Sequence, residues 1–225
     1  MSSTPTVIAI DGPASSGKST LGQFLAEKLD YLYFDTGCLY RAVTVAALQR
    51  GLAPTDAAAV AALAAALDIR VKSPDENDGR QYTVLVDELD VTWELRSRQT
   101  DAHVSTISAF AEVRRTLTER MRAYARAGSV VMVGRDIGTV VLPDAPLKIY
   151  LDAGVEERAR RRHAENLARG ESSDYEVVFA GMRARDRTDS EREAAPLRAA
   201  PDAIMLDTTG MKVEQALAEI ESIVQ

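Results

Sequence analysis

Short apolar runs alternate with helical patterns along most of the chain. The runs that end on polar residues, as buried strands do, predict five strands over residues 6–10, 31–35, 129–136, 147–153 and 202–208. The intervening patterns predict helices over residues 18–29, 37–51, 56–68, 97–110, 111–127, 155–192 and 212–224. Strands separated by helices in this way predict an α/β fold, a doubly wound parallel five-stranded sheet with helices on both faces.

The pattern changes between residues 68 and 92. Short β-rich runs at 68–73, 80–88 and 89–92, broken by "PDENDGR", predict a small antiparallel sheet inserted into the α/β chain. In parallel sheets, ligands bind beyond the carboxyl ends of the strands. We therefore expect one cleft bordered by the polar residues that follow the strands, namely Asp11, Asp35, residues 134–136 and Asp152.

A glycine-rich loop joins the first predicted strand to the first predicted helix. "GPASSGKS", residues 12–19, satisfies G-x-x-x-x-G-K-[ST], the phosphate-binding loop pattern, in the strand–loop–helix context that the motif requires. Backbone N–H groups of such a loop surround phosphate oxygens, Lys18 reaches the β- and γ-phosphates, and the Ser19 hydroxyl ligates Mg²⁺. We predict a nucleoside triphosphate site formed by Gly12, Pro13, Ala14, Ser15, Ser16, Gly17, Lys18, Ser19 and Thr20.

Composition narrows the functional classes. The 225 residues carry a net charge of −7, which disfavours broad binding to DNA or RNA, and no apolar run approaches the roughly 20 residues that span a bilayer. One cysteine, Cys38, excludes an internal disulfide, and with only two histidines a zinc site is not expected. We expect a cytoplasmic monomer that binds small molecules, without nucleic acid or membrane partners.

The loop indicates a nucleoside triphosphate but leaves the fate of its γ-phosphate open. The N-K-x-D element that reads guanine in GTPase switches is absent, which counts against a GTPase. A phosphotransferase needs anion clamps for an acceptor and a lid that excludes water. Two alternatives stay open from the residues alone: a P-loop kinase of another small anionic metabolite, and a regulatory protein that uses ATP as a switch.

Several further motifs resemble those of the bacterial cytidylate kinases. They are "DTGCLYR" (35–41), "ISAFAEVR" (107–114), "VGRDIGTVV" (133–141), "PDAPLKIYLDA" (143–153), "EERARRR" (156–162) and "RARDRTDSER" (183–192), in the family's order and spacing. The resemblance implies transfer of the γ-phosphoryl group of ATP to CMP or dCMP, with Mg²⁺, in a lid-closed site. It also implies a core of residues 1–35, 112–153 and 194–225, an acceptor-binding insertion over 36–111 and a helical lid over 154–193.

The resemblance also assigns roles to individual residues. It implies CMP binding by Thr36, Tyr40, Arg41, Ser105, Arg114, Arg135, Asp136, Arg185, Asp189 and Arg192. Within this set, Arg41, Arg135 and Arg192 match phosphate ligands. Ser105, Arg114 and Asp136 match contacts to the cytosine ring, and Arg185 with Asp189 match contacts to the sugar hydroxyls. On the ATP side, Arg158 and Arg162 match lid arginines, although "RARRR" leaves the choice among them open.

The chemistry of these residue types agrees with the implied roles. Arginine presents a fixed fork of donors that suits phosphate oxygens, and a carboxylate suits the exocyclic amine that distinguishes cytosine from uracil. We expect the catalytic groups to be Lys18, Arg135, Asp136, Arg185 and Arg192. Phosphoryl transfer depends chiefly on alignment and charge stabilisation, so Asp136 as a catalytic base is the minority interpretation, and an Arg135–Asp136 structural ion pair is the non-functional one.

The chain departs from the commonest family pattern in small ways. "GKST" replaces the frequent "GKGT" and keeps the hydroxyl, while Thr36 and Cys38 stand where serine and alanine also occur. Arg187 and Thr188 vary within their motif. The ranking of CMP, dCMP and UMP, and the range of donor nucleotides, do not follow from the sequence.

Overall fold

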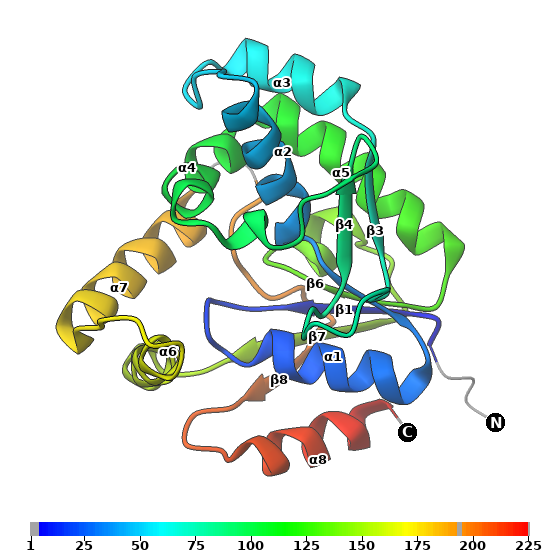
Figure 1. Cartoon of the computed structure of the whole chain (residues 1–225). Helices are drawn as coiled ribbons and strands as arrows, with labels where there is room; N and C mark the ends of the chain where they lie inside the picture. The colour runs from blue at the N-terminus through cyan, green and yellow to red at the C-terminus, as the bar shows by residue number, and fades with distance from the viewer. Residues whose placement is uncertain (1–4, 193–194, 225) are drawn as a thin grey trace. The chain divides into compact units, whose positions relative to one another are not determined.

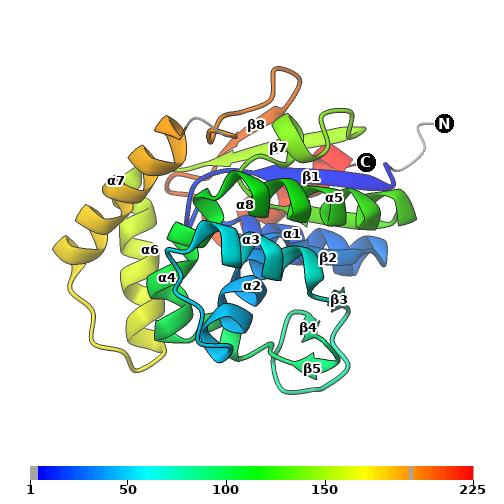
Figure 2. The same cartoon turned by 90° about the horizontal axis from the view of Figure 1, so that it is seen from above.

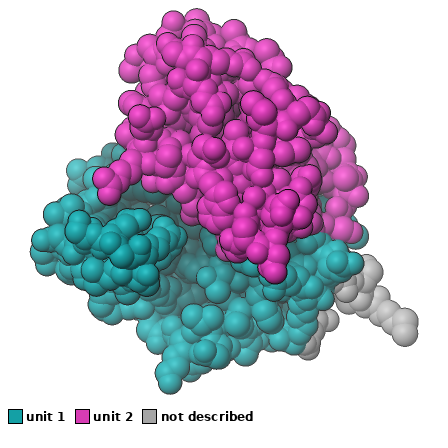
Figure 3. Space-filling view, in the orientation of Figure 1, with its two compact units in different colours: residues 1–31, 131–225 teal, residues 32–130 magenta. Residues whose placement is uncertain are grey.

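A computed structural model describes residues 5–192 and 195–224 of the chain. It divides into two compact units, coloured separately in Figure 3. Unit 1 contains residues 1–31 and 131–225, and unit 2 contains residues 32–130. This description does not separate a lid from a core, so the predicted three-part division into core, insertion and lid stays a prediction.

The predicted parallel sheet is present. Its strands lie in the order β2-β6-β1-β7-β8, with bounds β1 Val7–Asp11, β2 Leu32–Asp35, β6 Val130–Val133, β7 Leu147–Asp152 and β8 Ile204–Asp207. β1 pairs in parallel with β7, Asp11 opposite Tyr150, and β7 pairs in parallel with β8, Asp152 opposite Asp207. Non-consecutive neighbours require helical crossovers, which explains why helices alternate with strands along the chain.

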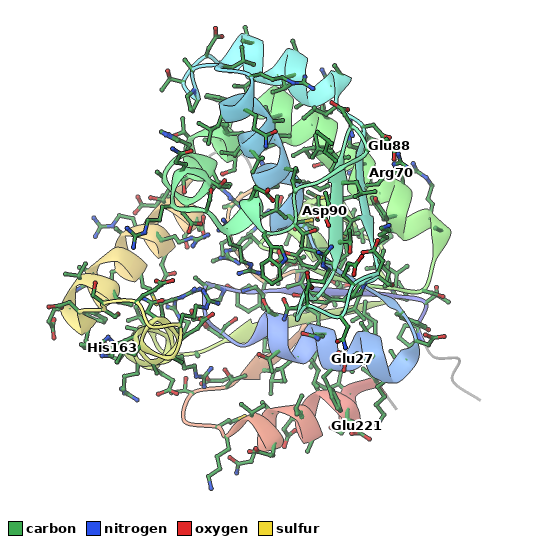
Figure 4. The ribbon with its side chains drawn as sticks, viewed as in Figure 1. Glu27, Arg70, Glu88, Asp90, His163 and Glu221 are labelled. Carbon is green, nitrogen blue, oxygen red and sulfur yellow. The ribbon has the colours of Figure 1, made fainter. Side chains whose placement is uncertain are left out.

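Unit 1 surrounds its strands with helices from both ends of its sequence. These are α1 Lys18–Leu29, α6 Val155–Ala168, α7 Tyr175–Glu191, α8 Val213–Val224 and the π-helical turn η2 Ile137–Val141. α1 packs on β1 and beside α8, where Lys28 forms an ion pair with Glu221, and α6 and α7 pack together as a helical hairpin (Figures 1 and 4). The single charged segment predicted over 155–192 is therefore two helices joined by a turn.

Unit 2 contains the predicted antiparallel sheet and four helices. Its elements are α2 Gly37–Gln49, α3 Ala57–Ala66, β3 Ile69–Lys72, β4 Thr83–Val86, β5 Leu89–Asp90, the 3-10 turn η1 Glu94–Arg96, α4 Arg98–Ala109 and α5 Ala111–Ala127. β3, β4 and β5 pair in that order as antiparallel neighbours (Figure 2), and Arg70 of β3 forms an ion pair with Glu88 in the β4–β5 turn (Figure 4). The change of pattern at residues 68–92 was therefore read correctly.

Apolar side chains fill each unit. In unit 1 the fully buried side chains include Ile8 and Ile10 of β1 and Leu21 and Leu25 of α1, which explains the helical spacing seen in the sequence. In unit 2 they include Phe34, Leu39, Leu95, Ile107 and Leu117. Within the part of the chain that the structure describes, no helix is long and apolar enough to cross a bilayer.

Gly12 marks the sharp turn by which β1 enters the glycine-rich loop. Its φ is +146°, and a Cβ placed on it would lie 1.9 Å from the carbonyl oxygen of Leu151 on β7. Glycine alone adopts this backbone conformation without strain, and the neighbouring atom belongs to a strand of the sheet and not to a flexible side chain. The loop therefore starts where β1 and β7 approach too closely for any side chain.

We predict that Gly12→Ala lowers the free energy of unfolding by at least about 3 kcal/mol, because strain and steric overlap add. Gly170→Ala is the matched control: Gly170 also has a positive φ, +75°, but open space surrounds it. It should cost about 1 kcal/mol. Urea unfolding of both variants measures the difference, and equal losses would contradict the close-approach argument.

Candidate active site

The glycine-rich loop ends at the N-terminus of α1 in an arrangement suited to an anion. Gly17 forms the N-cap in the left-handed region, and among the described residues no side chain caps this helix. The first turn of α1 carries no acidic residue. Unsatisfied N–H groups and the helix dipole favour negative charge at such an end, so phosphate oxygens fit here without competition from the protein.

Two polar side chains of the loop, those of Ser16 and Lys18, are buried. Ser16 is fully buried, and its Oγ has no hydrogen-bond partner within residues 5–192 and 195–224. Lys18 is buried, and its Nζ donates to the carbonyl oxygen of Pro13 at 2.6 Å, which places the ammonium inside the loop. A buried polar atom without a partner is costly. These groups fit a bound polyphosphate, which would supply acceptors to both.

Three arginines of α6 reach the loop by different routes. Arg158 donates to Ala14 O at 3.3 Å, and Arg162 Nε donates to Ser15 Oγ at 3.3 Å. Arg161 donates to Thr208 O at 2.6 Å, while Thr208 Oγ1 donates to Ser16 O at 3.1 Å. The start of α6 is therefore attached to the phosphate-binding loop.

Arg158 and Arg162 differ in burial and in the hydrogen bonds that they make to the protein. The Arg158 side chain is 5% exposed and also donates to Ala153 O at 2.8 Å and to Asp186 Oδ2 of α7 at 2.6 Å. The Arg162 side chain is 34% exposed, and its other close partner is Glu165, 3.4 Å away. Arg158 thus braces the fold, whereas the Arg162 guanidinium is more accessible.

Asp11 ends β1 and is only 4% exposed. Its Oδ1 accepts from Ile137 N at 2.8 Å and its Oδ2 from Gly138 N at 2.7 Å. The carboxylate at the end of β1 therefore caps the N-terminus of the helical turn η2. Burial raises the pKa of Asp11 from 3.8 to about 6, although the two backbone N–H groups and Lys18 lower it, and Asp136 adds to the increase.

The raised pKa of Asp11 has a definite sign for stability. The folded chain holds this proton more tightly than the unfolded chain, so the group's contribution to the free energy of unfolding falls as pH rises from 3.8 to about 6. The charged form of Asp11 is therefore retained at neutral pH at some cost to stability. Buried groups of this kind often belong to functional sites.

Charged side chains converge on Asp189 of α7. Arg135 Nε donates to Asp189 Oδ2 at 3.0 Å, Arg192 Nη1 lies 3.8 Å from Oδ1, and Arg185 Nε lies 4.0 Å from Oδ2. Arg192 Nη2 also lies 3.9 Å from Asp136 Oδ1. Three guanidinium groups against two carboxylates leave a net positive charge, and the pairing holds the arginines in place for an anion. Arg135 and Asp189 pair although 54 residues separate them in the sequence.

Unit 2 gathers the other predicted CMP-binding residues around α2. Arg41 Nη1 donates to Asp101 Oδ1 at 2.6 Å and to Leu95 O at 2.7 Å. Arg114 is buried, donates to Ser108 O at 3.2 Å, and has its guanidinium 5.5 Å from the centre of the Tyr40 ring. Aromatic stacking orients this guanidinium as well as stabilising it.

The last two predicted residues of unit 2 lie at element ends or on the surface. Thr36 is the buried N-cap residue of α2 and follows Asp35, the last residue of β2. Ser105 is exposed on α4. Asp35 accepts from Gly37 N at 3.0 Å, so it fixes the turn between β2 and α2.

Comparison with known proteins identifies the family. A family model described as cytidylate kinase matches residues 8–225. The chain belongs to the cytidylate kinase family. It is 49% identical over 221 residues to a cytidylate kinase of Herpetosiphon aurantiacus, covering 98% of this chain and 95% of that one. It is 51% identical over 217 residues to a cytidylate kinase of Roseiflexus castenholzii, covering 96% of this chain and 92% of that one.

A solved structure supports the fold alone. An uncharacterized protein from Eubacterium ventriosum has a TM-score of 0.53 with 13% identity over 97% of both chains. The curated relatives carry the function: this chain is an enzyme of the cytidylate kinase family, and membership implies phosphoryl transfer from a nucleotide to CMP.

The sequence motifs of this kinase contain the candidate site residues but do not reveal the residues that hold them in place. Asp101, Asp186, Arg161 and Thr208 were not singled out, yet they hold Arg41, Arg158 and the phosphate-binding loop. Asp11 was noted only as a residue at a strand end. Its position directly before the glycine-rich loop was the available signal.

We predict that Arg158→Met lowers the free energy of unfolding by about 2 to 4 kcal/mol, because it removes four hydrogen bonds, two of them to a carboxylate. Arg162→Met, the matched control on the same helix, should change it by less than about 0.5 kcal/mol. Chemical denaturation measures both values. Equal effects of the two substitutions would contradict the division of roles.

Proposed function

We propose that this enzyme transfers the γ-phosphoryl group of ATP to CMP or dCMP, giving ADP and CDP or dCDP, by direct in-line transfer in a lid-closed site. The observation that carries the proposal is the phosphate-binding loop, whose helix N-terminus has no capping side chain among the described residues and whose Ser16 Oγ is buried without a partner there. Family membership supplies the acceptor. Cytoplasmic location and the monomeric state stay predictions.

The donor side is assigned to the loop and to α6. Backbone N–H groups of residues 12–20 would bind the β- and γ-phosphates, with Lys18 placed to follow the charge of the transferring group. Arg162 would pair with the triphosphate, because its guanidinium lies at Ser15 and is partly exposed. Arg158 would act on the same loop through Ala14, as a brace.

Mg²⁺ fits this donor side through Ser19. Ser19 lies exposed in the first turn of α1, directly after Lys18, where a hydroxyl can reach a metal held on the triphosphate. Within the described ranges, no group of three or more His, Cys, Asp or Glu side chains is placed to hold a metal ion. An ion held there would neutralise negative charge on the triphosphate.

The acceptor side follows the roles that the resemblance to the family implies, and the chemistry of the residues agrees with them. Arg135, Arg192 and Arg41 offer forked donors to the CMP phosphate, and Arg185 with Asp189 would hold the sugar hydroxyls. Asp136 would accept from the cytosine amine, while Arg114 and Ser105 would contact the other polar atoms of the ring. A site whose buried groups stay unpaired against UMP rejects it, by up to ~10⁴ for well-made polar contacts.

Catalysis in this proposal is alignment and charge neutralisation. The CMP phosphate is already anionic, so its oxygen attacks the γ-phosphorus without a general base. Lys18, Arg135, Arg185 and Arg192 would stabilise the charge on the equatorial oxygens. Asp136 would orient the acceptor, and Asp189 would keep two of these arginines in place. Closure of α6 and α7 would exclude water, which competes as an acceptor.

We predict that a coupled ADP-release assay with CMP, dCMP, UMP, AMP and shikimate gives the highest kcat/KM for CMP and dCMP. Lys18→Met is the control. It should lower kcat by at least about 100-fold, because the positive charge of Lys18 that would stabilise the transferring group is lost. A higher kcat/KM with another acceptor would exclude the proposed reaction. Tight ATP binding without acceptor-stimulated turnover would instead favour a regulatory nucleotide-binding protein.

We predict that CMP plus a non-hydrolysable ATP analogue protects residues 154–192 from trypsin, because a charged helical lid closes on both ligands. Either ligand alone should protect less. Cleavage after Arg115 and Arg122 of α5, which lie outside the lid, provides an internal reference. Unchanged cleavage of 154–192 with both ligands present would argue against the lid assignment.

A further inference from the structure

The Asp11 carboxylate connects two segments that the proposed reaction uses separately. Gly12, the first residue of the phosphate-binding loop, follows Asp11 directly in the sequence. Its two oxygens accept from the N–H groups of Ile137 and Gly138, which follow Arg135 and Asp136. The donor loop and the acceptor-side residues Arg135 and Asp136 are thus linked through one buried carboxylate.

The packing around Gly138 makes this link stiff. A Cβ on Gly138 would lie 3.2 Å from Lys148 Cδ and 3.4 Å from Asp11 Oδ2, so both side chains pack closely against the Cβ side of this glycine. Lys148 is itself anchored by Asp202 at 2.7 Å and by the Pro143 carbonyl. The Asp136 side chain makes no capping hydrogen bond to η2 among the described residues, and Asp11 caps the turn in its place.

We propose that ionised Asp11 is a positioning residue for phosphoryl transfer, holding the start of η2, and with it Arg135 and Asp136, in register with the phosphate-binding loop. The inference rests on the proposed function. Asp11 does not touch the reacting atoms in this scheme. It acts through the two backbone N–H groups, because a charged carboxylate accepts two hydrogen bonds that a neutral carboxyl group of the same shape does not accept together.

The charges facing Asp11 determine how its role depends on pH. Asp136 disfavours its ionised form, Lys18 favours it, and the side chain of Lys148 of β7 packs against the same glycine, Gly138. Tyr150, its register partner on β7, feels the Asp11 charge. Because burial raises the pKa of Asp11 to about 6, positioning should be complete above that pH and lost as pH falls through it.

Asp11→Asn tests the proposal in the full-length enzyme with saturating ATP and CMP. Asparagine keeps the shape, but its amide group places a donor against a backbone donor. At pH 8 we expect kcat to fall about 10- to 100-fold, since hydrogen bonds to a charged group are lost and the catalytic groups shift. KM for both substrates should change less than kcat, because the residues that bind them remain.

The pH profile separates positioning from mere stability. The phosphate of CMP also titrates near pH 6, so the quantity to follow is the ratio of wild-type kcat to Asp11→Asn kcat, in which substrate ionisation cancels. The ratio should fall toward about 1 as pH drops below 6, because a protonated Asp11 resembles asparagine. A ratio near 1 at pH 8, or one that stays constant between pH 5 and 8, would overturn the proposal.

Asp56→Asn is the matched control. Asp56 caps α3 by accepting from Ala59 N at 3.0 Å and belongs to no assigned binding group. Since Asp and Asn cap helices about equally well, its kcat and pH profile should equal those of the wild type. A change in this control as large as that in Asp11→Asn would show a general effect of removing a capping charge, which overturns the specific role of Asp11.

Nuclear magnetic resonance of the wild-type enzyme decides the case if Asp11→Asn does not fold or if wild type fails to phosphorylate CMP. The second result would refute the proposed function and leave the coupling testable. The amide signals of Gly12, Ile137 and Gly138 should titrate together with the Asp11 carboxyl carbon near pH 6. A carboxyl that titrates near 4, or a Gly12 amide that does not follow the other two, would overturn the inference.

Discussion

Backbone N–H groups at a helix start need hydrogen-bond acceptors, and the helix dipole favours acceptors that carry negative charge. Unit 1 has two such helix starts connected to the end of β1. The start of η2 is capped by Asp11, a carboxylate of the protein itself. The start of α1, which the chain reaches from Asp11 through the loop of residues 12–17, has no side-chain cap among the described residues and no acid in its first turn. The protein itself thus supplies the acceptors at the start of η2, whereas the start of α1 remains open to an anion such as a phosphate.

The arginines follow a related division between bracing and binding. Arg158 is buried against backbone carbonyls and Asp186, whereas Arg162 and Arg185 are partly or largely exposed. Asp189 collects three guanidinium groups, and the pairs place positive charge without requiring each arginine to be ordered by the ligand. Pre-ordered charge of this kind costs little reorganisation when a phosphoryl group is transferred.

Much of the fold followed from local pattern. The bounds of α1 and the strands β1, β2 and β8 came within a residue or two of the expected ranges, because apolar spacing and glycine turns are local signals. The π-helical turn η2 was not anticipated. The carboxylate that caps it belongs to Asp11 of β1, which lies 126 residues before Ile137 in the sequence. The turn that splits residues 155–192 into α6 and α7 was not anticipated, although Gly170, with a φ of +75°, and Asp174, which caps α7 by accepting from Val177 N, are local signals for it.

The sequence alone determined the chemistry: the glycine-rich loop, the arginine-bearing motifs and the family they belong to are all contiguous stretches. Only the tertiary structure decided which arginines are committed to the fold, because Arg158 and Arg162 lie four residues apart in one charged run and differ only in what packs against them. It also decided the role of Asp11, whose partners lie on a distant turn. Residue type determines the chemistry that a side chain can provide, whereas burial and long-range hydrogen bonds determine whether that side chain is held by the protein or is accessible to a ligand.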